Sequence, residues 1–487
     1  MGVNSSGSSS DPSIQLDFNR TKQKALNINL DDTVYGTFAE IGAGQEVARY
    51  FFQVGGASGT IAKTMSAYDM VFSDAIYGKE PSGRYVCESR LNKMLQREFS
   101  LLIKRLEGKR SLKTKFFAFA NTVAASGHLN NKEGHGWIGV RFQHGPKEPC
   151  SDVIIHIRLL DKRNLLQQQT LGIIGVNLLH CSFYLHNSEE DQFVEGLIEE
   201  LGPERIEIDM IKVVGPAFSK MDNRILALQL VKKGVTNAVM FDQDGSVLQP
   251  SDILYKKNIL ALRGSFRPPT LVNMDMLTEG LEEFKKEPGV QNDRIVTLCE
   301  ITINNLQASA EGSGSFNEKD FLARVDLLGA LGQKVLISNY QDYYKLAQYF
   351  GRYTQRKMGI ILGIFNLKEV FDPKSYPDLE GGILEALGKL FKFPLRMYVY
   401  PSKTTDGNGY LTCANLPMEA PLGLIFGYFL QQKKIIDFEK FDSEILHIFS
   451  RRVLKMIQKG DSGWEKMVPK TVAKTVIEKK LFGHTCE

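Results

Sequence analysis

The strongest constraint in this sequence is an alternation of short apolar runs with amphipathic segments between residues 205 and 400. The runs have the length and the β-branched content that are typical of strands. The strand candidates are Ile206–Val214, Asn237–Phe241, Ile259–Arg263, Ile295–Ile303, Lys334–Ser338, Met358–Ile364 and Leu395–Tyr400. Helix candidates lie between most of them, at Asp222–Lys233, Met274–Lys286, Glu318–Leu331, Asp342–Thr354 and Leu379–Phe391. Such an alternation predicts a parallel sheet in an α/β fold.

This many strands suit an open, doubly wound, Rossmann-like sheet, and a closed β/α barrel is the alternative. We therefore predict an α/β nucleotide-binding-like domain over residues 201–420 and a helical C-terminal segment over 421–487. An α+β domain is expected over 29–200, mainly helical over 33–110 and followed by an antiparallel β region. Residues 1–28 are rich in serine and read as a disordered tail.

Composition excludes several classes of protein. The 60 basic residues nearly balance the 56 acidic ones, so the charge gives no argument for nucleic-acid binding. No apolar run reaches the roughly 18 residues of a transmembrane helix. No two of the six cysteines have the Cys-x-x-Cys spacing of a metal or redox pair, and reduced thiols in the cytoplasm fit best.

The first six residues, Met1-Gly2-Val3-Asn4-Ser5-Ser6, fit the pattern for N-myristoylation on Gly2. One myristoyl chain gives only weak, reversible membrane binding, so the expected location is cytoplasmic with a peripheral membrane option. A plain Ser/Gly tail is the other interpretation. The intact mass of protein made in eukaryotic cells distinguishes the two.

The most specific string follows the third strand candidate and opens a helix. It reads Leu262-Arg263-Gly264-Ser265-Phe266-Arg267-Pro268-Pro269-Thr270-Leu271-Val272-Asn273-Met274-Asp275-Met276. In parallel sheets, ligands bind beyond the carboxyl ends of the strands. A glycine at that place lets the backbone approach a phosphate, and the start of a helix offers free N–H groups.

This string resembles the signature of the nucleotidyltransferase superfamily, of the nicotinamide or nicotinate mononucleotide adenylyltransferase type. That signature is roughly Gly-Ser-Phe-Asn-Pro-x-Thr-x-x-His, and Gly264, Ser265, Phe266, Pro268 and Thr270 match it. Arg267 stands in place of the asparagine and Asn273 in place of the histidine. A second family string, of the Ile-Ser-x-Thr-x-x-Arg type, is not visible. Across its length the chain resembles a group sometimes labelled nicotinate-nucleotide adenylyltransferase.

The resemblance implies an enzyme that joins a pyridine mononucleotide to ATP with Mg2+ and releases pyrophosphate. Arg267 and Asn273 would then be the catalytic contacts to the triphosphate. The substrate-binding residues would be Gly264, Ser265, Phe266 and Thr270. The expected ligand is a nucleotide, with no protein-held metal.

A rival string, Phe241-Asp242-Gln243-Asp244-Gly245-Ser246, resembles the first motif of haloacid-dehalogenase-like phosphohydrolases. In that family Asp242 would be the nucleophile and Asp244 the general acid or base. The acidic fourth motif of that family is missing, and the string also suits a tight turn. A third hypothesis is a non-catalytic interaction protein in which both strings are turns.

A weaker string, Glu40-Ile41-Gly42-Ala43-Gly44, resembles the glycine loop of methyltransferases and dinucleotide-binding folds. It lacks the third glycine, and the entry to a helix is the alternative interpretation.

Overall fold

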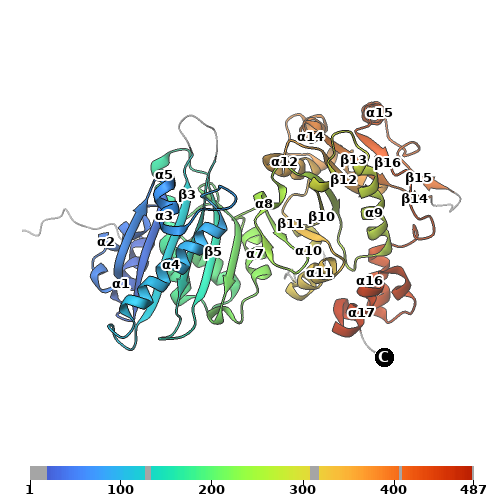
Figure 1. Cartoon of the computed structure of the whole chain (residues 1–487). Helices are drawn as coiled ribbons and strands as arrows, with labels where there is room; N and C mark the ends of the chain where they lie inside the picture. The colour runs from blue at the N-terminus through green and yellow to red at the C-terminus, as the bar shows by residue number, and fades with distance from the viewer. Residues whose placement is uncertain (1–18, 127–132, 308–316, 405–408, 485–487) are drawn as a thin grey trace, which may run out of the picture. The chain divides into compact units, whose positions relative to one another are not determined.

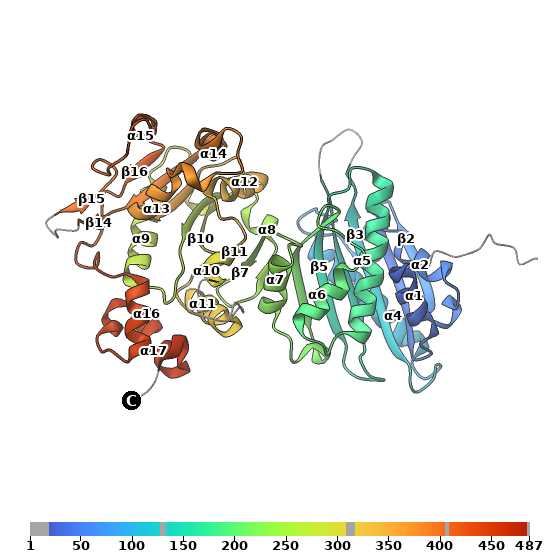
Figure 2. The same ribbon diagram turned by 180° about the vertical axis from the view of Figure 1, so that it is seen from behind.

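The computed structural model describes residues 19–126, 133–307, 317–404 and 409–484 (Figure 1; Figure 2 shows the reverse view). The chain divides into two compact units. Unit 1 holds residues 1–207 and 212–221, and unit 2 holds 208–211 and 222–487. In the part of the chain that the structure describes, no helix is long and apolar enough to cross a membrane. Gly2, the predicted lipidation site, lies outside the described residues.

A six-stranded sheet in the order β2-β1-β3-β4-β5-β6 contains the strands of the N-terminal part. Its strands are β1 (Val34–Gly42), β2 (Ile61–Ala67), β3 (Lys115–Ala124), β4 (Gly134–Phe142), β5 (Ser151–Leu159) and β6 (Ile206–Val214). β1 pairs in parallel with β2 and β3, whereas β3, β4 and β5 pair antiparallel. The predicted antiparallel region is therefore present.

Two strands replace part of the helical region expected over 33–110. β1 lies between β2 and β3, and its residues are almost all buried. A strand buried on both faces lacks the alternation of polar and apolar side chains that identifies a strand in a sequence. The same region does contain the expected amphipathic helix, α4 (Glu88–Leu106), which buries Leu91, Met94 and Leu95. The buried helix expected near residues 165–185 is α5 (Asn164–Tyr184).

The tail predicted to reach residue 28 ends earlier, because α1 spans Arg20–Leu30. A buried lysine, Lys24, anchors this helix. Its Nζ donates to Oδ1 of Asn177 at 2.7 Å and to the carbonyl of Gly196 at 2.9 Å. It also forms an ion pair with Glu199. These partners are more than 150 residues away in sequence, so local composition does not reveal the helix.

An eight-stranded sheet in the order β16-β13-β12-β9-β10-β11-β7-β8 forms unit 2. The strands are β7 (Ala238–Phe241), β8 (Val247–Leu248), β9 (Asn258–Arg263), β10 (Ile295–Thr302), β11 (Lys334–Ser338), β12 (Met358–Gly363), β13 (Leu395–Tyr400) and β16 (Ile435–Asp437). The six strands from β16 to β11 run parallel. Numbered along the chain from β9, they follow the order 3-2-1-4-5-6 of the Rossmann fold. The predicted α/β class with a Rossmann-like sheet is confirmed, and the sheet is open rather than closed into a barrel.

The helices between these strands lie close to their predicted positions. They are α7 (Asn223–Lys232), α9 (Leu271–Lys285), α11 (Glu318–Ala330), α12 (Tyr343–Tyr353) and α14 (Gly382–Phe391). A short helix that was not predicted, α13 (Ile364–Val370), follows β12. Two strand assignments differ from the prediction. β6 belongs to the six-stranded sheet, and β7 runs antiparallel to β11. A turn then pairs β7 with β8.

The C-terminus is helical, as predicted, with α15 (Leu422–Gln431), α16 (Ser450–Lys459) and α17 (Lys470–Lys479). The three-residue strand β16 interrupts this region and was too short to show a period. α16 and α17 surround the buried Trp464 in an apolar cluster, and they pack against α11 and against Leu271 and Val272 at the start of α9.

The Glu40–Gly44 string lies at the carboxyl end of β1, before α2 (Val47–Gln53). The Glu40 carboxylate accepts the backbone N–H of Val47 at 3.2 Å and Nδ2 of Asn121 at 3.3 Å. A side chain at Gly44 would collide with Asn121. Burial raises the pKa of Glu40 to about 7, although these hydrogen bonds oppose the shift. The string therefore forms a tightly packed turn around a buried carboxyl group.

We predict that Glu40→Gln stabilises unit 1 above neutral pH. The folded-state pKa of about 7 lies above the ordinary 4.5. The contribution of Glu40 to the free energy of unfolding of unit 1 is thus fully present below pH 4.5, and it is lost as the pH rises through 7. A pKa shift costs about 1.4 kcal/mol per unit, so the shift from 4.5 to about 7 corresponds to a loss of about 3 kcal/mol. Glutamine avoids this loss, because it keeps the hydrogen-bond acceptor and carries no charge.

The measurement is urea unfolding followed by fluorescence in a Trp464→Phe background, where Trp137 of unit 1 is the remaining tryptophan. Glu148→Gln, in an exposed loop, is the matched control. If Glu40→Gln and Glu148→Gln gained the same stability relative to the unaltered protein between pH 5 and pH 8, the assignment to Glu40 would be contradicted.

Candidate functional site

The strand order of unit 2 places a topological switch point between β9 and β12. From β9 the chain crosses to β10 and β11 on one side, and from β12 to β13 and β16 on the other. In folds of this kind the ligand crevice lies outside the carboxyl ends of the two central strands. The predicted motif, residues 264–273, leaves β9 at this place, and Gly363, the last residue of β12, leads directly into α13 (Ile364–Val370).

A buried ion pair fixes the strand ends beneath the motif. Arg263 donates through Nε to Oε2 of Glu300 at 2.6 Å and through Nη2 to Oε1 at 2.9 Å. Glu300 is fully buried and also accepts the hydroxyl of Ser338 at 2.6 Å. The guanidinium of Arg263 lies over the ring of Tyr343 at 4.3 Å. The network ties the ends of β9, β10 and β11 together and uses Arg263 for structure.

The first residues of the turn are packed more tightly than the sequence indicated. The N–H of Gly264 donates to the carbonyl of Glu300 at 3.0 Å, so it is already paired. Phe266 is only 1% exposed and has a positive φ of 47°. A Cβ at position 264 would approach its ring to 3.0 Å. Gly264 therefore leaves room for the Phe266 ring, and the phosphate contacts predicted for both residues remain predictions.

Arg267 is held by one of its three guanidinium nitrogens. Its Nε donates to Oδ1 of Asp320 on α11 at 2.6 Å. Nη1 and Nη2 donate to no residue in the described part of the chain, and the side chain is 16% exposed. The guanidinium is thus oriented by Asp320 while its two outer nitrogens keep their donors. This geometry suits a charged side chain that binds an oxyanion through a planar fork.

Asp320 is in turn paired with Arg324, one helical turn further along α11. Arg324 is fully buried, and its Nη1 donates to the carbonyls of Ser265 at 3.2 Å and Asn305 at 3.1 Å. Burial lowers the pKa of Arg324, and the charge of Asp320 opposes that shift. Arg324 therefore connects α11 to the backbone of the motif.

Asn273, predicted as a catalytic contact, caps α9 together with Thr270. Its Oδ1 accepts the N–H of Thr270 at 2.9 Å and the hydroxyl of Thr270 at 3.0 Å. This reciprocal pattern is a capping box. Nδ2 of Asn273 and the N–H groups of Leu271 and Val272 make no hydrogen bond to a described residue. The helix start therefore keeps donors, but Thr270 itself is buried and engaged.

Ser450, the first residue of α16, is a contact of the motif that the sequence did not predict. Its hydroxyl donates to the carbonyl of Pro268 at 3.0 Å, so the start of a second helix touches the motif. Arg451 and Arg452 follow, both exposed and without an ion pair to any described residue. Only the fold brings residues 450–452 to residue 268, and the sequence offered no signal beyond the polar start of an amphipathic helix.

The rival pair, Asp242 and Asp244, lies in the hairpin turn between β7 and β8. The N–H of Asp242 donates to the carbonyl of Ser246 at 2.9 Å, and Asp242 is paired with Lys334, which lowers its pKa. Because β7 is antiparallel to β11, this turn lies at the edge where the parallel strands begin. The turn therefore does not converge with the motif after β9. This placement gives the phosphohydrolase hypothesis no support.

Comparison with known proteins adds little to this geometry. No protein-family model matches the sequence, and no curated protein matches it. Structural neighbours of the chain include competence/damage-inducible (CinA) proteins. One is the CihA protein of Agrobacterium tumefaciens, at 15% identity, with 34% of this chain and 93% of that chain covered and a TM-score of 0.23. Another is the ComA protein of Klebsiella pneumoniae, at 11% identity, with 35% and 100% covered and a TM-score of 0.24. Similarity at this level supports no conclusion about fold or function.

We predict that Arg324→Ala destabilises unit 2 by about 3–5 kcal/mol, because it breaks a buried ion pair, leaves Asp320 with Arg267 as its remaining cation and removes the donor of two carbonyls. Urea unfolding followed by Trp464 fluorescence in a Trp137→Phe background measures this. The matched control is Arg294→Ala, since Arg294 forms a surface pair with Asp293 at 4.0 Å. An exposed pair contributes at most about 1 kcal/mol. Similar effects of the two changes would contradict the role given to Arg324.

Proposed function

We propose that unit 2 binds a nucleotide at the switch point between β9 and β12 and acts as a nucleotidyltransferase. Its substrates would be a pyridine mononucleotide and ATP. The observation that carries the proposal is the position of the motif, which follows the first strand of a 3-2-1-4-5-6 sheet and opens α9. The resemblance of residues 264–270 to the adenylyltransferase signature supports the same activity.

The capacity of this place to bind a polyphosphate comes from three groups of donors. The outer nitrogens of Arg267 are unpaired among the described residues, as are the first N–H groups of α9. The start of α16 lies here as well, because Ser450 donates to the carbonyl of Pro268, and Arg451 and Arg452 follow Ser450 in the sequence. Two helix N-termini and the guanidinium of Arg267 favour a ligand with several negative charges. A nucleoside triphosphate meets that requirement.

In the proposed reaction a phosphate oxygen of the mononucleotide attacks the α-phosphorus of ATP. The bond from that phosphorus to the bridging oxygen breaks, and pyrophosphate leaves. Arg267 would stabilise the charge that develops on pyrophosphate, and Nδ2 of Asn273 would donate to a phosphate oxygen. Gly264, Ser265, Phe266 and Thr270 would shape the turn that carries these two residues. Asp320 would act as a positioning residue for Arg267.

The described residues do not include a cluster of three or more metal-ligating side chains. The nearest carboxylate, Asp320, is 5% exposed and already serves two arginines. The residues present do not fit a protein-held Mg2+. Mg2+ would instead arrive with its phosphates as part of the MgATP substrate.

We predict that MgATP raises the melting temperature of unit 2 and that Arg267→Ala weakens MgATP binding about tenfold. Charge-assisted hydrogen bonds to a phosphate are worth about 1.5–3 kcal/mol. Trp464 fluorescence in a Trp137→Phe background follows the unfolding of this unit. Activity is measured as pyrophosphate released from ATP in the presence of nicotinamide or nicotinate mononucleotide.

Arg294→Ala is the matched control, because Arg294 precedes β10 and lies at the amino ends of the parallel strands. It should bind MgATP as the unaltered protein does. No thermal shift with millimolar MgATP would refute nucleotide binding. A thermal shift without release of pyrophosphate from ATP in the presence of either mononucleotide would refute the transferase activity and retain the binding site.

A further inference from the structure

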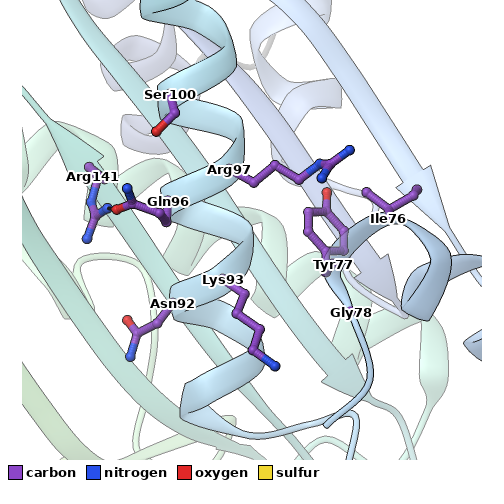
Figure 3. A pocket seen from close by; sticks show the side chains of 9 residues that line it. All are labelled: Ile76, Tyr77, Gly78, Asn92, Lys93, Gln96, Arg97, Ser100 and Arg141. Atoms are coloured by element: carbon purple, nitrogen blue, oxygen red, sulfur yellow. Dashed lines mark hydrogen bonds between the residues drawn. The ribbon is translucent and has the colours of Figure 1, made fainter.

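Unit 1 contains a groove that is separate from the proposed nucleotide site. It has a volume of about 630 Å³ and lies over the outer face of α4, between the end of α3 (Met70–Tyr77) and β4 (Figure 3). The lining residues are Ile76, Tyr77, Gly78, Asn92, Lys93, Gln96, Arg97, Ser100 and Arg141. Three of them are cationic and none is acidic, although the chain as a whole is nearly balanced in charge.

Two of the three cations are held in place by acids that do not line the groove. Nζ of Lys93 is 2.9 Å from Oε1 of Glu80. Arg141 donates to Asp152 through Nε at 2.7 Å and Nη2 at 2.6 Å, and its Nη1 donates to Gln96. Glu80 and Asp152 hold Lys93 and Arg141 in defined positions. The residues that line the groove therefore present hydrogen-bond donors and no carboxylate.

Arg97 differs from the other two cations. It is exposed, and it makes no hydrogen bond or ion pair with any residue in the described part of the chain. Figure 3 shows Arg97 extending from α4 on the side of Tyr77, while Gln96 extends towards Arg141 on the other side of the helix. The hydroxyl of Tyr77 is already committed to Glu98 at 2.9 Å. The whole guanidinium fork of Arg97 is therefore available to a ligand.

We propose that this groove binds a small phosphate monoester, with Arg97 as its main anchor. The guanidinium fork matches two oxygens of a phosphate, and the ammonium of Lys93 adds a second charge. Lys93 and Arg97 extend on one side of α4, and Asn92, Gln96 and Ser100 line the groove on the other side, near Arg141, where they supply neutral donors. A dianionic phosphate with three terminal oxygens uses such a set more fully than a carboxylate does. The volume lies within the range of small-molecule sites.

The groove is open to solvent, so salt screens its charges and the expected affinity is millimolar. We therefore expect glycerol 3-phosphate, at about 10 mM and constant ionic strength, to raise the melting midpoint of unit 1. The midpoint is read from Trp137 fluorescence in a Trp464→Phe background. Acetate at the same ionic strength should give a much smaller shift. Arg97→Ala should weaken binding at least about tenfold and leave the midpoint without ligand unchanged.

Lys104→Ala is the matched control, because Lys104 is an exposed cation on α4 that does not line the groove. Arg267→Ala tests whether the phosphate acts through unit 2 instead. Both variants should respond to glycerol 3-phosphate as the unaltered protein does. The proposal is overturned by an absent shift, by an equal shift with acetate, or by a response that Arg97→Ala leaves intact. An equal loss of the response to glycerol 3-phosphate in Lys104→Ala or in Arg267→Ala would overturn the proposal as well.

Discussion

The Asp320–Arg324 pair on α11 is the interaction on which the candidate site of unit 2 depends. Arg324 holds the carbonyl of Ser265, and Asp320 holds Nε of Arg267, so one helix fixes both the backbone and the main cation of the motif. The pair is buried, and burying charges costs free energy that only well-placed partners offset. The geometry of the motif is therefore decided by a helix more than 50 residues away in sequence.

A second buried network lies below the first. Arg263, Glu300 and Ser338 connect three parallel strands near their carboxyl ends, and each of these residues belongs to a different strand. Together the two networks leave the charge of Arg263 fully satisfied and that of Arg267 only partly satisfied. That difference explains why Arg267 suits a ligand and Arg263, four residues earlier, does not.

The units share a physical pattern at the carboxyl ends of their parallel strands. In unit 1 the carboxyl group of Glu40 is buried beside Asn121 and the start of α2. In unit 2 the ends of β9 and β10 carry a carboxylate with a guanidinium partner. Glu40 has no cation of this kind among its hydrogen-bond partners, which is consistent with its raised pKa.

The sequence by itself determined the α/β class, the positions of six strands of unit 2, the helix after β9 and the turn around Asp242, because each follows from local periodicity or turn chemistry. It did not reveal β1, which is buried on both faces, or α1, which is fixed by Lys24. Tertiary structure alone decided that Asp320 orients Arg267 and that Ser450 reaches Pro268. Those facts depend on which distant segments meet, and neither spacing nor composition carries that information.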